Sequence, residues 1–175
     1  MSKPTTGKPR APQEPAPAAA PLDGPVVPRA LPLIGVALAL IGLAVSVYLT
    51  IEHYTSPTLL ACPENSVINC LKVTTSPESV VFGIPVVWLG VGYFVVMTAA
   101  NLPLAWRSTH RLLRLGRLAL AVVGVGMALY LVYAELFEIN AICLYCTSVH
   151  VISALLFVLV AFGTALTAGP AGARA

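Results

Sequence analysis

Two cysteines of a C-x-x-C motif, Cys143 and Cys146, are the residues of this chain best suited to chemistry. They stand where the last long apolar run, residues 141–168, begins. Residues three apart share one face of a helix, roughly 4.5 Å apart along its axis, so a disulfide can form and break between them. The N–H groups of a helix start favour the Cys143 thiolate, whereas burial beside lipid raises a thiol pKa. The spacing predicts a redox dithiol and leaves the balance of these two effects open.

A second cysteine pair, Cys62 and Cys70, forms a C-x7-C motif in the polar segment 52–79. An even number of cysteines favours disulfides in an oxidising compartment, provided that both pairs face the same side. A loop pair and a helix-anchored pair together have the form of an electron relay connected by thiol–disulfide exchange. The alternatives are two structural disulfides or a zinc site, although no accompanying histidine pattern predicts a metal. Thr147, rather than a histidine, follows the C-x-x-C, so haem attachment is not indicated.

The composition is typical of a membrane protein. Of 175 residues, 58% are hydrophobic and only 10% are charged, and the mean hydropathy is +0.87. Four apolar runs approach the ~20 residues that span a bilayer. They predict an all-α integral membrane four-helix bundle with a long outer loop, 52–79, and with spans at about 31–51, 80–102, 117–139 and 141–168. A net charge of +3 gives no reason to expect a nucleic-acid partner.

Lysine and arginine are distributed unevenly over the connections. Four lie in the Pro- and Ala-rich segment 1–30, four lie around the second connection and one lies in the C-terminal segment 169–175, against only Lys72 in the first loop. We therefore expect both terminal segments to be cytoplasmic tails, the first of them disordered, and both cysteine pairs to face the extracytoplasmic side of the cell membrane. No secretory signal peptide is visible, so the first span is expected to direct insertion.

His150 is the one ionisable residue inside the fourth run, four residues beyond Cys146 and on the same helix face. Such residues usually face a cavity or a bundle interior. His150 therefore either hydrogen-bonds a quinone oxygen or passes its proton, or it merely satisfies a neighbouring helix. Glu135 either relays protons or is a rim carboxylate in water, and we expect the second. The aromatic residues near the outer ends either line a flat-ring pocket or form an interfacial belt; they are Phe82, Trp88, Tyr133, Phe137 and Tyr145.

Four motifs, in their order, resemble the vitamin K epoxide reductase family in its bacterial branch. They are the C-x7-C pair, Ser76 six residues after it, Phe82-Gly83-Ile84-Pro85 at the expected start of the next helix, and the C-x-x-C that opens the last helix. The resemblance covers roughly residues 31–162. Members of the family are quinone reductases built as a four-helix bundle around a quinone, and bacterial members make disulfides in exported proteins. The DsbB family performs the same overall reaction but carries its two cysteine motifs in the reverse order.

The resemblance implies a role for each cysteine. Cys146 would be the thiol closest to the quinone, with Cys143 as its partner in the dithiol. Cys70 would pass electrons to Cys143, and Cys62 would exchange with a reduced thioredoxin-fold partner. Many bacterial members carry a fused thioredoxin-like domain after a fifth helix, whereas this chain stops after the fourth. The resemblance therefore implies a separate, DsbA-like protein as the partner.

The resemblance also indicates residues that contact the quinone. Ser76 matches a loop serine that hydrogen-bonds near the active site. In vertebrate members a tyrosine stands at the position of His150, and an asparagine that contacts vitamin K stands at the position of Ser79. These departures favour a respiratory quinone, menaquinone or ubiquinone, over vitamin K epoxide. The residues predicted to bind the quinone are Ser76, Ser79, Phe82, Trp88, Tyr145 and His150.

Two other classes of protein fit the cysteine count. A membrane scaffold with purely structural disulfides predicts inert cysteines and no dependence on a quinone. A metal-handling membrane protein predicts bound zinc or copper that protects the thiols. A relay differs from both because removing Cys70 or Cys143 should trap mixed disulfides with other proteins.

Overall fold

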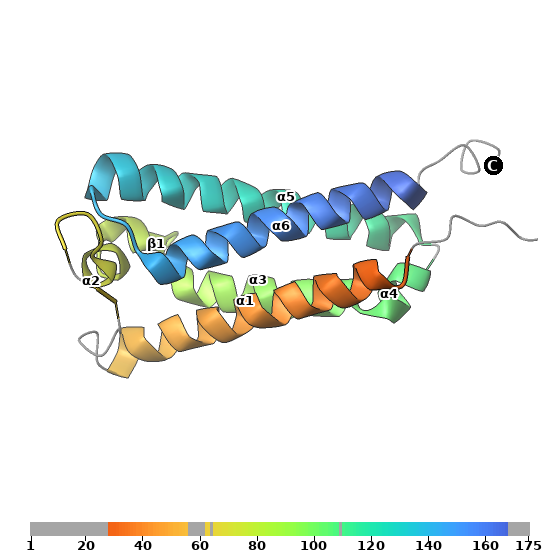
Figure 1. Ribbon diagram of the computed structural model, residues 1–175, viewed down its shortest axis with the longest axis horizontal. Coiled ribbons are helices and arrows are strands. Elements are labelled where there is room, and N and C mark those ends of the chain that lie inside the picture. The colour runs from red at the N-terminus through yellow and green to blue at the C-terminus, as the bar shows by residue number, and fades with distance from the viewer. Residues whose placement is uncertain (1–27, 56–61, 64, 109, 168–175) are drawn as a thin grey trace, which may run out of the picture.

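The computed structural model describes residues 28–55, 62–63, 65–108 and 110–167, and most of them are helical (Figure 1). The predicted tails, 1–30 and 169–175, lie almost wholly outside the described residues. The elements in chain order are α1 (Ala30–Thr55), α2 (Cys70–Thr74), η2 (Pro77–Ser79), β1 (Val80–Val81), β2 (Ile84–Pro85), α3 (Val86–Asn101), α4 (Pro103–Arg107), α5 (Arg111–Tyr133), η3 (Ala134–Ile139) and α6 (Leu144–Thr167).

The four longest helices lie side by side along the molecule (Figure 1). Helix α1 packs against α3 and α6, and α5 packs against α6 and α3. Three helices are long and apolar enough to cross a membrane, namely Ala30–Thr55, Arg111–Ile139 and Leu144–Leu166. Helix α3 is apolar but has only 16 residues. The chain is thus a membrane protein with three helices of spanning length, and a shorter fourth helix completes the array.

Residues 80–85 form a hairpin and not the start of a helix, which corrects the predicted second run, 80–102. Strands β1 and β2 pair antiparallel, with Val80 opposite Pro85. The two residues between them, Phe82 and Gly83, have φ angles of 53° and 79°. Positive φ at both positions is typical of the tight turn that joins two strands. The helix therefore begins only at Val86, and the fold is not purely α.

Close helix contacts depend on small residues. A Cβ atom at Gly42 of α1 would collide with the Phe94 ring of α3, so only glycine allows this approach. Around Phe94 lies the main buried cluster, which has residues from all four long helices: Ala39, Phe94, Met97, Ala121, Ile152, Leu156 and Val160. Tight packing of this kind holds helices together where lipid removes the hydrophobic driving force between them.

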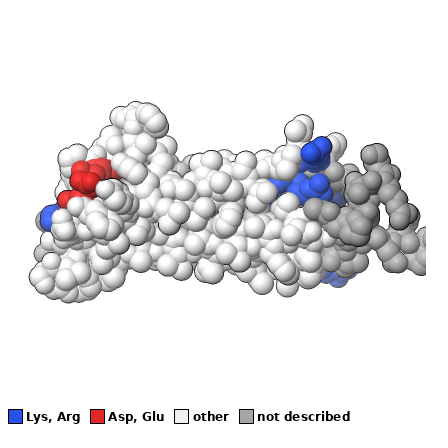
Figure 2. Space-filling view, turned by 90° about the horizontal axis from the view of Figure 1, so that it is seen from above, with Lys and Arg blue, Asp and Glu red and all other residues white. Residues whose placement is uncertain are grey.

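Charged side chains gather at the two ends of the molecule. Figure 2 shows the acidic residues over the α2 end and most of the basic residues at the opposite end, with an uncharged surface between them. Large apolar side chains such as Leu40, Val123 and Val158 are exposed on the helices along this middle region. An uncharged, apolar outer surface is what a lipid environment requires.

Helix α5 begins at Arg111, earlier than the predicted boundary at 117, and it continues into a π-helical segment, η3. The segment ends at Asn140, whose φ of 53° is left-handed. The N–H groups of Asn140 and Ala141 both reach the carbonyl oxygen of Glu135. This short turn leads directly into the C-x-x-C motif.

Candidate redox site

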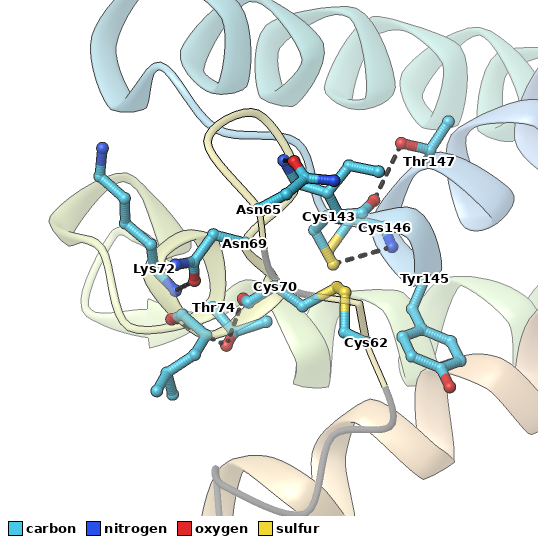
Figure 3. The surroundings of a disulfide bond; sticks show 12 residues. Cys62, Asn65, Asn69, Cys70, Lys72, Thr74, Cys143, Tyr145, Cys146 and Thr147 are labelled. Atoms are coloured by element: carbon cyan, nitrogen blue, oxygen red, sulfur yellow. Dashed lines mark hydrogen bonds between the residues drawn. A yellow bond between two sulfur atoms is a disulfide. The ribbon is translucent and has the colours of Figure 1, made fainter.

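All four cysteines lie at the α2 end of the molecule, in and around one buried cluster (Figure 3). The cluster consists of Cys70, Val73, Ala134, Ile139, Ala141 and Cys143, and Cys62, Tyr145 and Cys146 pack against it. Two cysteine motifs that are more than 70 residues apart in the chain therefore meet in space, as an electron relay requires.

The loop pair is a disulfide, Cys62–Cys70, with Cα atoms 6.2 Å apart. Cys70 is the first residue of α2, and the preceding Asn69 caps that helix because its side-chain oxygen accepts from the Lys72 N–H at 2.8 Å. An asparagine cap satisfies a backbone donor that a helix start otherwise leaves free. The cap fixes Cys70 at the buried end of the short helix.

A backbone pairing connects the loop to the C-x-x-C segment. Ile68 and Ile142 form a parallel bridge. The Asn69 N–H donates to the Ile142 carbonyl at 3.1 Å, and the Ile142 N–H donates to the Val67 carbonyl at 2.9 Å. Cys70 follows this bridge by two residues and Cys143 follows it by one. The pairing therefore sets one cysteine of each motif beside the other.

The dithiol lies at the start of α6. Cys143 is fully buried and Cys146 is partly exposed, and the Cys146 N–H donates to the Cys143 sulfur at 3.2 Å. A hydrogen bond from the Cys146 thiol is the main effect that lowers the pKa of Cys143, and backbone N–H groups of Cys146 and Tyr145 add to it. Burial and the charge of Glu135 oppose the shift. The balance that the sequence left open thus favours the thiolate of Cys143.

A cavity of about 300 Å³ lies between the four long helices, beneath the cysteine cluster. Cys146 borders it, whereas Cys143 is not among the described residues that line it. The volume falls at the lower end of the range for small-molecule pockets, and apolar side chains supply most of the lining. One sulfur of the dithiol thus borders the cavity, and the other lies in the cluster with Cys70.

Comparison with known proteins identifies the family of this chain. The family model described as the vitamin K epoxide reductase family matches residues 33–161. The chain belongs to this family. No curated protein sequence matches the chain. The resemblance found in the sequence is confirmed, and membership indicates a membrane thiol–disulfide oxidoreductase that works with a quinone.

The cavity fits a quinone head group, which is a flat ring with two acceptor oxygens. Three residues predicted to bind the quinone, Ser76, Ser79 and His150, line the cavity. The Ser79 hydroxyl donates to the Ser76 carbonyl at 2.6 Å, and the Ser76 hydroxyl donates to the Val73 carbonyl of α2 at 2.9 Å. The His150 side chain is buried, and its Nδ1 has no hydrogen-bond partner among the described residues. An unpartnered buried nitrogen is a candidate partner for a ligand oxygen.

The three aromatic residues of the same prediction do not border the cavity. Phe82 lies in the hairpin turn and is 100% exposed. Trp88 is half exposed, and its Nε1 donates to the Tyr54 hydroxyl at 3.0 Å. Tyr145 packs on Tyr48, with ring centroids 5.2 Å apart. The structure brings none of the three to the pocket. Their binding of a quinone stays a prediction.

Glu135 is buried, which contradicts its predicted place as a rim carboxylate in water. Only 4% of its surface is exposed, and it borders the cavity together with Cys146. The prediction rested on the place of Glu135 near the end of the third apolar run, whereas the structure packs that end, the π-helical segment η3, against α2. Tyr93 and Ser153 also line the cavity, and no spacing in the sequence singled them out.

A metal-binding arrangement is a separate possibility that the geometry can test. Within residues 28–55, 62–63, 65–108 and 110–167, no three or more His, Cys, Asp or Glu side chains are grouped so as to hold an ion. Two of the four cysteines are already joined to each other. The described cysteines are thus arranged as a disulfide beside a dithiol.

Proposed function

We propose that this protein is a membrane thiol:quinone oxidoreductase that reoxidises a thioredoxin-fold, DsbA-like partner and so supports disulfide formation in exported proteins. The observation that carries the proposal is the division of the dithiol, in which Cys146 borders the cavity and Cys143 packs in the cluster with Cys70. A dithiol in this position can receive electrons on one side and deliver them on the other.

The proposed path moves two electrons in three exchanges. A partner dithiol reduces the Cys62–Cys70 disulfide and becomes a disulfide itself. Cys70 then attacks Cys143 of an oxidised C-x-x-C, which forms a Cys70–Cys143 disulfide and releases the Cys146 thiol. Cys62 next attacks Cys70, which restores the loop disulfide and releases Cys143. Finally the Cys143–Cys146 disulfide forms again, and its two electrons and two protons leave to the quinone. The structure, with the loop pair joined and the inner pair free, corresponds to the stage before the last step.

The cavity supports menaquinone or ubiquinone as the acceptor. Apolar residues of α3 and α5 surround the ring position, and His150 supplies the polar contact from α6. Ser76 and Ser79 close the loop side of the cavity, where their hydroxyl oxygens could accept hydrogen bonds from the O–H groups of the reduced quinone. For the exposed aromatic residues Phe82 and Trp88, we propose contact with lipid at the membrane surface.

We further propose four membrane spans within residues 31–168, with both termini in the cytoplasm and the cysteines outside. The bias of basic residues toward the end opposite α2 supports this orientation (Figure 2). Helix α3 is roughly 24 Å long, short of the ~30 Å hydrocarbon core, so the adjacent hairpin 80–85 would complete that crossing.

The test is an assay of purified protein in detergent with a reduced DsbA-like protein, in which quinone absorbance and partner thiols are both followed. Wild type should oxidise the partner and reduce the quinone in equal amounts. Cys146→Ala should stop quinone reduction, because the thiol that borders the cavity is lost. Cys62→Ala should stop only the reaction with the partner, so a small dithiol that reaches the inner pair should still drive quinone reduction.

The same assay separates the relay from a scaffold. If wild type reduces no quinone and its cysteines stay unreactive toward the partner, the disulfide is structural and the proposal is wrong. If Cys146→Ala keeps turning over quinone, the relay stands but the role of Cys146 does not.

A further inference from the structure

Glu135 occupies a position that the proposed electron path leaves unexplained. It is the one carboxylate that is buried within the described part of the chain, and it lies in η3, between the last turn of α5 and the dithiol. Its side chain borders the same cavity as Cys146. A buried carboxyl group inside a membrane protein is costly, and such groups commonly take part in proton transfer.

The contacts of Glu135 tie it to both cysteines of the dithiol. Its carboxylate accepts a hydrogen bond from the backbone N–H of Cys143. Its charge acts on the Cys143 and Cys146 sulfurs. Its own carbonyl oxygen receives the Ala141 N–H at 3.1 Å, which holds the turn in place beneath the motif. Backbone and side chain together hold the carboxyl group beside the reacting sulfurs.

No lysine or arginine is present among the described residues that line the cavity, so no cation there neutralises Glu135. The elements that pack on η3 are α2 and α5. The only basic residue of α2 is Lys72, which is exposed, and the basic residues of α5 lie in its first two turns, at the end far from η3. The titratable groups that share the cavity with Glu135 come from α1, η2, α3 and α6, and they are His53, Glu78, Tyr93, Cys146 and His150. Among them, only the cysteine gives up a proton during the reaction.

We propose that Glu135 carries a proton from the dithiol to the quinone; this rests on the function proposed above. Overall, the dithiol loses two electrons and two protons as the Cys143–Cys146 bond forms, and two O–H bonds form on the quinone oxygens. The Glu135 carboxylate takes the proton of the Cys146 thiol and gives it to the oxygen nearer the dithiol. The other proton is the one that Cys143 gives to water when its thiolate forms, and water returns an equivalent proton to the second quinone oxygen. The Glu135 carboxylate is then free again, and electrons and protons balance.

A purely structural role of Glu135 and a role in proton transfer predict different results for the substitution Glu135→Gln. Glu135→Gln keeps the size of the side chain and an oxygen that accepts from the Cys143 N–H, but an amide does not accept a proton at these pH values. A structural acceptor would tolerate glutamine, whereas a proton carrier would not. Glu138→Gln is the matched control, because Glu138 lies in the same segment and is exposed.

The first measurement is the rate of quinone reduction against pH, with a small dithiol as the electron donor. Loss of a positioned proton carrier commonly slows a reaction by 10² to 10⁴-fold. We expect Glu135→Gln to lose about 10²-fold or more and to show a pH profile without the limb that Glu135 contributes in wild type. Glu135→Asp should recover part of the rate, and Glu138→Gln should match wild type.

The second measurement uses no quinone. With Cys62→Ser and Cys70→Ser in place, the ultraviolet absorbance of the thiolate follows the titration of the inner dithiol alone. Because the charge of Glu135 raises the pKa of Cys143, Glu135→Gln should move this titration to lower pH, and Glu138→Gln should not. Thermal unfolding of each variant in detergent checks that the fold is kept.

The outcomes are distinguishable. An active wild type together with a Glu135→Gln variant of equal rate, unchanged pH profile and unchanged titration would overturn the role of Glu135 and leave the proposed function intact. A wild type that reduces no quinone would overturn the proposed function. If glutamine unfolds the protein, Glu135→Asp decides the question. A folded Glu135→Asp variant with a reduced rate and a pH profile shifted from that of wild type, as expected for a shorter carboxylate of lower ordinary pKa, would support the carrier, and one with wild-type rate and unchanged pH profile would contradict it.

Discussion

The two ends of the helix array both bury polar side chains, yet only one of them is arranged for chemistry. At the end opposite the cysteines, the Arg117 guanidinium stacks 3.5 Å above the Trp106 ring and donates to the Ala100 carbonyl at 3.3 Å. Asn101, the next residue after Ala100, is fully buried, packs on Gly35 of α1 and donates to the Met97 carbonyl at 2.9 Å. These groups pack on one another and on the helix backbone.

Unpartnered buried atoms occur at both ends, so they do not identify a site by themselves. Asn101 Oδ1 and Trp106 Nε1 lack a described hydrogen-bond partner, as His150 Nδ1 does. Each end also has a hollow, of about 300 Å³ beneath the cysteines and about 490 Å³ beside α4. What distinguishes the cysteine end is that a thiol and a carboxyl group border its cavity, whereas neither is among the described residues that line the other one. Space for a ligand beside reactive groups, and not burial of polarity, is what marks the site.

The largest effect should come from Cys143→Ser. The serine hydroxyl is close in size to the thiol but more polar, so at this fully buried position we expect a loss of about 1 to 3 kcal/mol in unfolding free energy, which leaves the protein folded. Electron transfer to the quinone should nevertheless fall to background, because no other cysteine connects Cys70 to Cys146. Thiol labelling during the reaction with a reduced partner should show Cys62 and Cys70 accumulating as free thiols. Continued quinone reduction by this variant would mean that electrons bypass Cys143.

The comparison also shows what could be predicted from sequence. The C-x-x-C at a helix start and the long apolar runs depend on spacing within one element, and the sequence carries that information directly. The burial of Glu135 and the hairpin at Phe82 and Gly83 depend on local backbone geometry, a π-helical turn and two positive φ angles, that a count of apolar residues does not register.

The meeting of the two cysteine motifs required a longer-range contact. The bridge between Ile68 and Ile142 joins residues 74 positions apart in the chain, and neither residue stands out by type. Only the resemblance to a family implied that Cys70 and Cys143 exchange electrons. Likewise, three of the six residues predicted to contact the quinone are aromatic. Residue type alone does not tell whether an aromatic side chain lines a pocket or lies exposed at the surface, as that of Phe82 does.

A smaller effect, at the opposite end, should come from Gly163→Ala. A Cβ atom at Gly163 of α6 would collide with the Trp106 ring, so the ring must move. Such overpacking costs about 1 to 3 kcal/mol of unfolding free energy. The control is Gly126→Ala in α5, where a Cβ atom meets nothing within 4 Å and where alanine should stabilise the helix by about 0.5 to 1 kcal/mol.

Denaturant titration in detergent measures both changes, and the quinone reduction rate per folded molecule should equal wild type in both variants. A specific loss of activity in Gly163→Ala would contradict the separation of the two ends, because it would connect the packed end to the redox site.

The smallest effect concerns the acidity of Cys143. Its pKa is lowered chiefly by the hydrogen bond from the Cys146 thiol, whereas burial and Glu135 act in the opposite direction. Removing that thiol with Cys146→Ala, in a protein whose loop cysteines are serine, leaves both opposing effects in place. The Cys143 thiolate should therefore appear at higher pH than the first thiolate of the intact dithiol, as followed by ultraviolet absorbance. A midpoint at equal or lower pH would mean that the backbone N–H groups of the helix start, and not the neighbouring thiol, stabilise the thiolate.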